Sequence, residues 1–217
     1  MASALNKMAK KYIKRPVAMA LGYIFYDPKY LKGKYFGKSP DKGWSWVMRN
    51  WFIQKVIGVN RQVPFPVDFR MKVGNWKNIE FDQDNINIFQ KVGNYYQATG
   101  AKIKIGKDTW IANGVAIITA NHDLEDLDTH AEAKDVVIGE ECWIGSNAVI
   151  LPGVTLGNHT VVGAGAVVTK SFEEGWCVIG GVPAKKIKDI EKYFDSILSF
   201  DLNTLTFEKP EDLFGDK

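Results

Sequence analysis

Few side chains in this 217-residue chain are suited to covalent or proton-transfer chemistry, and His122 is the strongest candidate. It stands five residues after Ile117, an apolar position of the repeat described below, so its side chain is expected to point away from the core. A neutral imidazole can remove the proton of a hydroxyl group while that group attacks a carbonyl carbon. An imidazole at this position could serve as a general base, and the alternative is a surface histidine at the edge of a loop. The other histidines, His130 and His159, are expected in a loop and at a corner.

Other catalytic motifs are absent from the sequence. There is no phosphate-binding GxxxxGK[ST] loop, no CxxC metal pair and no serine nucleophile elbow. The two cysteines, Cys142 and Cys177, are too few for a disulfide framework and are interpreted as packed, reduced thiols of a cytosolic protein. No metal is expected.

A six-residue repeat dominates the middle of the chain and predicts its fold. Bulky aliphatic residues recur at Ile138, Ile144, Ile150, Leu156, Val162 and Val168, and earlier at Ile105, Ile111 and Ile117. The next residue is often glycine or alanine. This period fits neither an α-helix nor a single strand, but it fits a short strand and a corner, repeated three times per triangular coil. We expect the aliphatic side chains to stack inside and the small residues to permit tight corners.

The repeat is interrupted once. Ile138 follows Ile117 by twenty-one residues, so a surface loop is expected at 121–135, where an insertion often lies on the binding face. Upstream, the strand-rich segment 73–94 is interpreted as the first, less regular coils.

The two ends are predicted to be helical. Apolar residues at helical spacing, Trp44, Val47, Trp51 and Val56, predict an amphipathic helix over 41–57 that ends at Gly58. After Pro183, the spacing of Ile187, Ile190, Phe194 and Ile197 predicts a helix that caps the last coil. The predicted organisation is a basic helical arm at 1–66, a β-helix domain at 67–182 and a C-terminal helical cap and tail at 183–217.

Four motifs, in this order, resemble those of the hexapeptide-repeat acetyltransferases. They are ITANHD at 118–123, CWIGS at 142–146, GAGAVVTK at 163–170 and GGVPA at 180–184. The resemblance covers roughly residues 60–190 and is closest to sugar, maltose or galactoside O-acetyltransferases and their capsule-polysaccharide relatives. It implies a mainly β fold, a left-handed parallel β-helix, with acetyl-CoA (coenzyme A) as co-substrate. It also implies a homotrimer with active sites between subunits.

The same resemblance gives His122 the role of the base and implies roles for other residues. Asn94 corresponds to a residue that binds the acceptor or the oxyanion, and Asp123 either orients His122 or caps the loop. The residues that match cofactor-binding positions are Trp143, Ser146, Ala164, Thr169, Lys170 and Lys188. Trp143 is expected against the pantetheine arm or the reacting centre. Lys188, with Lys185 and Lys186 in the first turn of the cap helix, is expected near the 3′-phosphate of coenzyme A.

Charge is concentrated near the N-terminus. Residues 1–57 carry twelve Lys or Arg against two acids, Asp27 and Asp41, although the net charge of the chain is only +3. Cations beside aliphatic and aromatic residues favour peripheral contact of this segment with an anionic membrane, and the alternative is that the arm packs on the coils. The apolar run 17–26 is too short to span a membrane and no signal-peptide cleavage pattern follows it. We therefore expect a cytoplasmic protein, free or peripheral at the inner face of the membrane, with no nucleic-acid partner.

These observations favour an acetyl-CoA-dependent O-acetyltransferase that acts on a hydroxyl of a sugar or polysaccharide precursor by direct attack. An N-acetyltransferase of an amino-sugar nucleotide and a catalytically inactive binding solenoid remain alternatives. A zinc enzyme is a further alternative, because β-helix carbonic anhydrases share the coil. It is disfavoured, since the three histidines lack the close pair spacing of such a site. The sequence does not name the acceptor.

Overall fold

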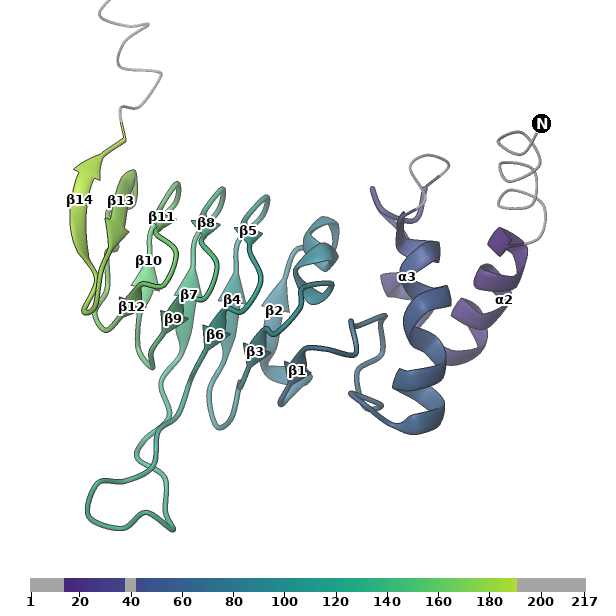
Figure 1. Cartoon of the computed structure of the whole chain (residues 1–217), viewed down its shortest axis with the longest axis horizontal. Coiled ribbons are helices and arrows are strands. Elements are labelled where there is room, and N and C mark those ends of the chain that lie inside the picture. Colours follow the sequence, from purple (N-terminus) through teal and green to yellow (C-terminus); the bar gives the residue numbers. More distant parts are fainter. Residues whose placement is uncertain (1–13, 38–41, 191–217) are drawn as a thin grey trace, which may run out of the picture.

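A computed structural model of the protein describes residues 14–37 and 42–190. It shows a helical arm at one end of a long stack of short strands, with a loop projecting from the side of the stack (Figure 1). Among these described residues, no helix is long and apolar enough to cross a membrane.

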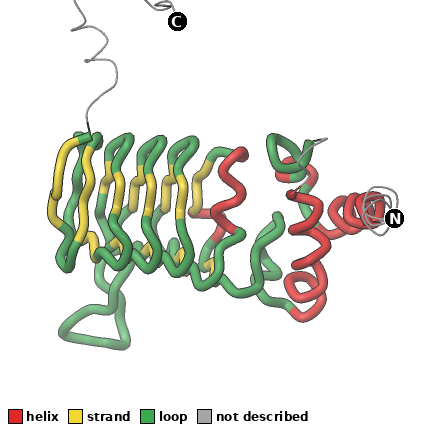
Figure 2. The backbone as a smooth tube through the Cα atoms, turned by 45° about the horizontal axis from the view of Figure 1, so that its top comes forward, coloured by secondary structure: helices red, strands yellow, loops and turns green. Residues whose placement is uncertain are grey.

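The stack is a parallel β-helix with three faces (Figure 2). Face A contains β1 (Lys72–Val73), β3 (Tyr95–Tyr96), β6 (Ala116–Ile117), β9 (Val149–Ile150) and β12 (Val167–Val168). Face B contains β2 (Ile79–Phe81), β4 (Ile103–Ile105), β7 (Val136–Ile138) and β10 (Thr155–Leu156). Face C contains β5 (Trp110–Ile111), β8 (Trp143–Ile144), β11 (Val161–Val162), β13 (Cys177–Gly180) and β14 (Lys185–Asp189). From β4 to β12 the chain visits faces B, C and A in turn, which confirms three edges per coil.

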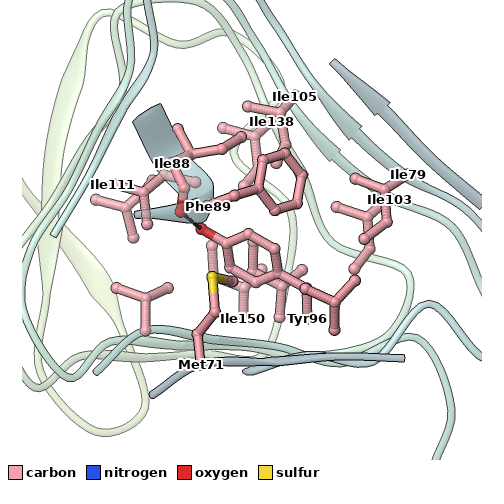
Figure 3. Packing of buried hydrophobic residues seen from close by; sticks show 14 of the residues in the cluster. Met71, Ile79, Ile88, Phe89, Tyr96, Ile103, Ile105, Ile111, Ile138 and Ile150 are labelled. Atoms are coloured by element: carbon pink, nitrogen blue, oxygen red, sulfur yellow. Dashed lines mark hydrogen bonds between the residues drawn. The ribbon is translucent and has the colours of Figure 1, made fainter. Parts of the chain in front are cut away.

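The repeated aliphatic residues form the core of the coils, as the six-residue period predicts. The six from Ile138 to Val168 are each at most 1% exposed. They stack in register, so that Ile150 lies between Ile117 and Val168 on face A. Toward the arm the column is continued by the larger rings of Phe89 and Tyr96 (Figure 3). Removal of these side chains from water is the main favourable contribution to folding.

Glycine was predicted after the aliphatic residues because it permits tight corners, but the structure shows another cause for it at Gly145. A Cβ atom at Gly145 would lie 2.6 Å from the backbone N of Ala164 and 2.7 Å from the backbone O of Val162, both in the next coil. Gly145 itself does not have a positive φ, whereas Asn147, two residues later, has φ 59°. At Gly145 a residue without a side chain is therefore required by the close approach of successive coils, and the left-handed corner conformation falls on Asn147.

The arm consists of two helices that pack on each other. They are α2 (Arg15–Phe25) and α3 (Lys42–Trp51), with a short 3₁₀ turn η2 (Pro28–Tyr30) between them. A π-helical segment, η3 (Phe52–Ile57), continues α3 and ends at Gly58, whose φ is 109°. The helix predicted for 41–57 is thus confirmed over 42–57.

A buried carboxylate ties the arm to the coils. Asp68 is fully buried, and Arg70 donates to both of its oxygens at 2.9 Å. Arg49 of α3 lies 3.2 Å from the same carboxylate. Burial by itself raises the pKa of Asp68, but the hydrogen bonds and charges of the two arginines outweigh burial and hold that pKa below its usual value. The described part of the arm therefore contacts the coils through Arg49, and contact of the arm with a membrane stays a prediction.

The first coils are less regular than the later ones, but not entirely as predicted. Ile79 and Phe81 lie in β2, whereas Ile86 and Ile88 lie in a 3₁₀ helix, η5 (Gln83–Phe89). A second such turn, η4 (Trp76–Asn78), precedes β2. The Asp82 side chain caps η5 by accepting from the backbone N of Asp84 at 2.8 Å, which favours a helical turn over a strand at this point.

The helix predicted to begin after Pro183 is wrong for the described residues. Lys185–Asp189 form the strand β14, which pairs antiparallel with β13. The last coil leaves the edge of β13 open, and β14 satisfies its backbone groups. Ile187, predicted to face a helical interface, is 66% exposed. Phe194 and Ile197 lie outside the described residues, and the domain boundaries stay a prediction.

Candidate active site

His122 lies in the neck of the loop that joins β6 to β7. The neck is closed by two backbone hydrogen bonds, from Asp123 N to Thr129 O (3.1 Å) and from Ala131 N to Asn121 O (3.0 Å). Between them, His122 and His130 face each other as an antiparallel bridge. The loop therefore folds back on itself and places a second imidazole beside the first.

The ring of His122 is held from two sides although it is exposed. Its Nδ1 lies 2.8 Å from the carbonyl O of Leu127, and its ring centroid lies 4.6 Å from that of His130 with the planes 29° apart. A carbonyl can only accept a hydrogen bond, so Nδ1 carries the hydrogen and Nε2 of the neutral ring carries the lone pair. This tautomer is the one that a general base requires, with Nε2 as the basic atom.

Asp123 supports the loop. Its Oδ1 accepts from the backbone N of Glu125 at 2.8 Å and of Asp126 at 3.4 Å. This is the loop-capping alternative of the two predicted for Asp123, and it acts on His122 only through the conformation of the loop.

Asn94 is buried inside the coil. It is 1% exposed, its Nδ2 donates to Tyr96 Oη at 3.1 Å, and its Oδ1 accepts from the backbone N of Val115 at 3.0 Å. Its side chain is thus directed into the coil and satisfies buried groups there, and the acceptor or oxyanion role of Asn94 stays a prediction.

Face C carries a straight column of outward side chains. In register from one end to the other, the column is Lys188, Val178, Val161, Trp143 and Trp110. Trp143 and Trp110 are 58% and 57% exposed. Lys186 pairs with Asp189, whereas Lys188 has no ion pair among the described residues. Strands in a sheet are spaced by about 4.8 Å, so Lys188 and Trp143 are separated by roughly 14 Å.

The remaining predicted cofactor residues are exposed and fall at two different corners. Ser146 and Ala164 occupy equivalent positions of successive coils at the corner between faces C and A. Thr169 and Lys170 follow β12 at the corner between faces A and B, which is also the corner from which the His122 loop projects. The structure thus places Trp143, Ser146, Ala164 and Lys188 on one side of the coil, and His122, Thr169 and Lys170 on another.

Two residues of this region did not figure among the predicted site residues. Trp110 precedes Ile111 just as Trp143 precedes Ile144, so the repeat itself could have identified it as an outward aromatic residue. His130 gave no such signal, because its contact with His122 depends on how the loop returns. His159, in contrast, is confirmed as a corner residue with φ 56°, stacked on Trp176 at 3.8 Å.

Comparisons with known proteins agree with this fold. Residues 135–170 match the family model described as bacterial transferase hexapeptide (six repeats). The chain is 37% identical over 128 residues to the putative lipopolysaccharide biosynthesis O-acetyl transferase WbbJ of Escherichia coli strain K12, which covers 52% of this chain and 61% of that protein. It is 31% identical over 134 residues to a probable macrolide acetyltransferase of Lysinibacillus sphaericus, which covers 52% of this chain and 73% of the relative.

A solved structure gives the same architecture. A galactoside acetyltransferase in complex with coenzyme A superposes with a TM-score of 0.50 and 24% identity, over 82% of this chain and 81% of the other. At that identity the likeness is one of fold. Together, the repeat, the fold and the relatives show that the chain belongs to the hexapeptide-repeat acetyltransferases. The chain spans only about three fifths of the length of WbbJ.

Proposed function

We propose that this protein is an acetyl-CoA-dependent O-acetyltransferase that acts on a hydroxyl group of a sugar or polysaccharide precursor. The observation that carries the proposal is the hydrogen bond from His122 Nδ1 to the Leu127 carbonyl, which leaves Nε2 of an exposed imidazole free to accept a proton.

In the proposed reaction His122 moves one proton and forms no covalent bond. Nε2 removes the proton of the acceptor hydroxyl while the hydroxyl oxygen attacks the acetyl carbonyl carbon. As the carbon–sulfur bond breaks, His122 returns that proton to the departing sulfur, so an ester and a free thiol are formed and the imidazole is again neutral. The Leu127 carbonyl and the stacked His130 ring restrict the orientation of His122 throughout.

The residues of the face C column fit acetyl-CoA. The column has a cation at one end (Lys188), aliphatic side chains in the middle (Val178 and Val161) and an indole beyond them (Trp143). Coenzyme A presents the same sequence of chemistry, with phosphates, then the pantetheine arm, then the thioester. We propose that Ser146 and Ala164 bind alongside this column, where the coil corner exposes them, and that Thr169 and Lys170 contribute from the next corner.

We propose a homotrimer in which the site forms between two copies of the chain. The division of the candidate residues between different sides of one coil supports this, since Trp143 lies on face C and His122 projects from the corner between faces A and B. The exposed indoles of the column and the 96% exposed Leu124 at the tip of the loop are apolar surface that a neighbouring copy would cover. The coil of such a trimer is expected to be left-handed, as the family resemblance implies. We propose that the protein acts in the cytoplasm, because acetyl-CoA is made there.

Thiol release tests the proposal. Purified full chain is incubated with acetyl-CoA and with neutral sugars, amino sugars or nucleotide sugars, and free thiol and acetylated product are measured. We expect acceptor-dependent thiol release and an ester product, and we expect His122→Ala to lower kcat by about 10²–10⁴ with nearly unchanged affinity for coenzyme A.

The matched control is His159→Asn, which replaces a histidine remote from the loop and suits a left-handed corner. It should retain wild-type turnover. Wild-type turnover in His122→Ala would remove His122 from the mechanism. An amide product would identify an N-acetyltransferase, and failure to bind coenzyme A by calorimetry would favour an inactive binding solenoid.

A further inference from the structure

The arm retains an apolar face after it has packed on the coil. Trp44 and Val47 of α3 are buried against the rest of the protein. In contrast, large apolar side chains remain exposed on α2 and η3, namely Val17, Tyr23, Ile24, Phe25, Phe52, Val56 and Ile57. After Arg15, α2 contains no charged residue, so its solvent-facing side lacks the charged residues that an amphipathic surface helix normally carries.

Part of this apolar surface is continuous across the two helices. The ring of Phe25 stacks on Trp51 at 5.5 Å, and Trp51 contacts Phe52 at 5.6 Å. The Tyr26 hydroxyl donates to Gln54 Oε1 at 3.0 Å, which fixes the end of α2 beside η3. We call the residues Ile24, Phe25, Trp51, Phe52, Val56 and Ile57 the arm patch. Ile24 and Ile57 are 71% and 62% exposed.

The surroundings of the arm patch are cationic. Arg61 donates from Nη2 to the backbone O of Val56 at 2.8 Å, so its guanidinium lies at the edge of the patch. Between residues 14 and 57 the described cations are Lys14, Arg15, Lys29, Lys32, Lys34, Lys42, Arg49 and Lys55, and the one described acid is Asp27. Lys29 pairs with Asp27 at 3.4 Å, whereas Lys34 and Arg49 pair with Asp108 and Asp68 of the coils. The sequence adds Lys7, Lys10 and Lys11 directly before them.

We propose that the arm patch is a membrane-docking surface that inserts its apolar side chains at the interface of an anionic lipid bilayer. Helix-borne aliphatic and aromatic side chains flanked by Lys and Arg are the combination that binds such an interface, with each nearby cation attracted to the negative surface potential. A second copy of this chain is a poor occupant, because two such arms would bring like charges together. The proposal is independent of the acetyl-transfer activity.

Flotation of the full chain with vesicles tests the proposal. The probes are vesicles of phosphatidylglycerol mixed with phosphatidylcholine, and vesicles of phosphatidylcholine alone. We expect the wild type to float with the anionic vesicles and not with the neutral ones, and its binding to fall as salt is raised. The triple variant Ile24→Ser, Phe52→Ser, Ile57→Ser should bind at least tenfold more weakly.

The control is the double variant Val182→Ser, Ile187→Ser, which removes two exposed apolar side chains at the other end of the stack. It should float like the wild type. Absence of wild-type flotation, or unchanged flotation of the triple variant, would overturn the proposal. A lower mass of the triple variant by light scattering, with no flotation of either protein, would also overturn it and would make the arm patch a contact between copies. Thiol release by the triple variant on a soluble acceptor shows separately whether the proposed enzyme is intact.

Discussion

Gly145 and Gly163 lie at the same position of successive coils, but alanine should destabilise the protein at Gly145 and have little effect at Gly163. A Cβ atom at Gly145 would come within 2.9 Å of three backbone atoms of the next coil, whereas the nearest atom to a Cβ at Gly163 is the backbone O of Ile179 at 3.4 Å. The first distance is far inside van der Waals contact, and the second is ordinary contact. Neither glycine has a positive φ, so alanine is acceptable at both positions by backbone conformation.

The magnitude for Gly145→Ala follows from the atoms that must move. Overpacking of this kind costs about 1–3 kcal/mol. The adjacent hydrogen bond from Gly145 N to Val162 O, 2.8 Å long, must lengthen, which adds about 0.5–1.5 kcal/mol. A loss of about 2–4 kcal/mol corresponds to a fall in Tm of roughly 4–16 °C for a chain of this size. Gly163→Ala should leave Tm within about 2 °C or raise it slightly, because alanine restricts the unfolded chain.

Thermal unfolding followed by circular dichroism at fixed protein concentration measures both variants, and the native spectrum at 20 °C and unchanged mass confirm that they fold. A Tm for Gly145→Ala within 2 °C of the wild type would refute the argument from close approach. An equal fall for Gly163→Ala would refute it as well, since it would show that the position needs glycine for its backbone conformation.

Three further predictions follow from the charges and the exposed surface. Lys188→Glu should weaken acetyl-CoA binding much more than it weakens binding of an analogue that lacks the 3′-phosphate, and equal losses in calorimetry would show that Lys188 does not contact that phosphate. Asp68→Asn should destabilise the protein at pH 7 by about 1.5–3 kcal/mol. The pKa of Asp68 is lowered on folding, so the ionised carboxylate adds to the free energy of unfolding at pH values above its unfolded pKa of about 3.9. This addition is lost as the pH falls through the folded pKa. Wild type and variant should therefore converge in urea-unfolding stability at acid pH, and a constant difference down to pH 2 would contradict the assignment. Light scattering should give a mass near three times 24.4 kDa, and a stable, active monomer would exclude the shared site.

The coils could be predicted from the sequence because one property, a buried aliphatic residue every six positions, is repeated enough times to exclude chance. Ile138, Ile144 and Ile150 are buried, and their six-residue period is the pattern from which their burial was predicted. Gly139 and Gly145, which follow the first two, could also be recognised in the sequence, but the reason for them could not, since the distance between coils is not encoded in any single coil.

The parts that could not be predicted depend on contacts between segments far apart. Ile187 belongs to a row of apolar residues at helical spacing, but it lies in the strand β14, which pairs with the open edge of β13. Asn94 approximately matched an acceptor-binding or oxyanion-binding position of the family, yet its amide forms hydrogen bonds with Tyr96 and Val115 inside the coil. His130 became a neighbour of His122 through the return of the loop, which no periodic pattern describes.

The loop that carries His122 has an evolutionary consequence that follows from polymer physics. Val136 on β7 pairs with Ile103, 33 residues earlier, whereas Thr155 on β10 pairs with Val137 after only 18. The entropy of closing a flexible loop grows with the logarithm of its length, so this longer closure costs only about 0.5 kcal/mol more than an ordinary coil. Insertions, deletions and substitutions in the loop are therefore nearly neutral for stability. Changes in this loop can therefore alter the surroundings of His122 while the stacked coils beneath remain the same.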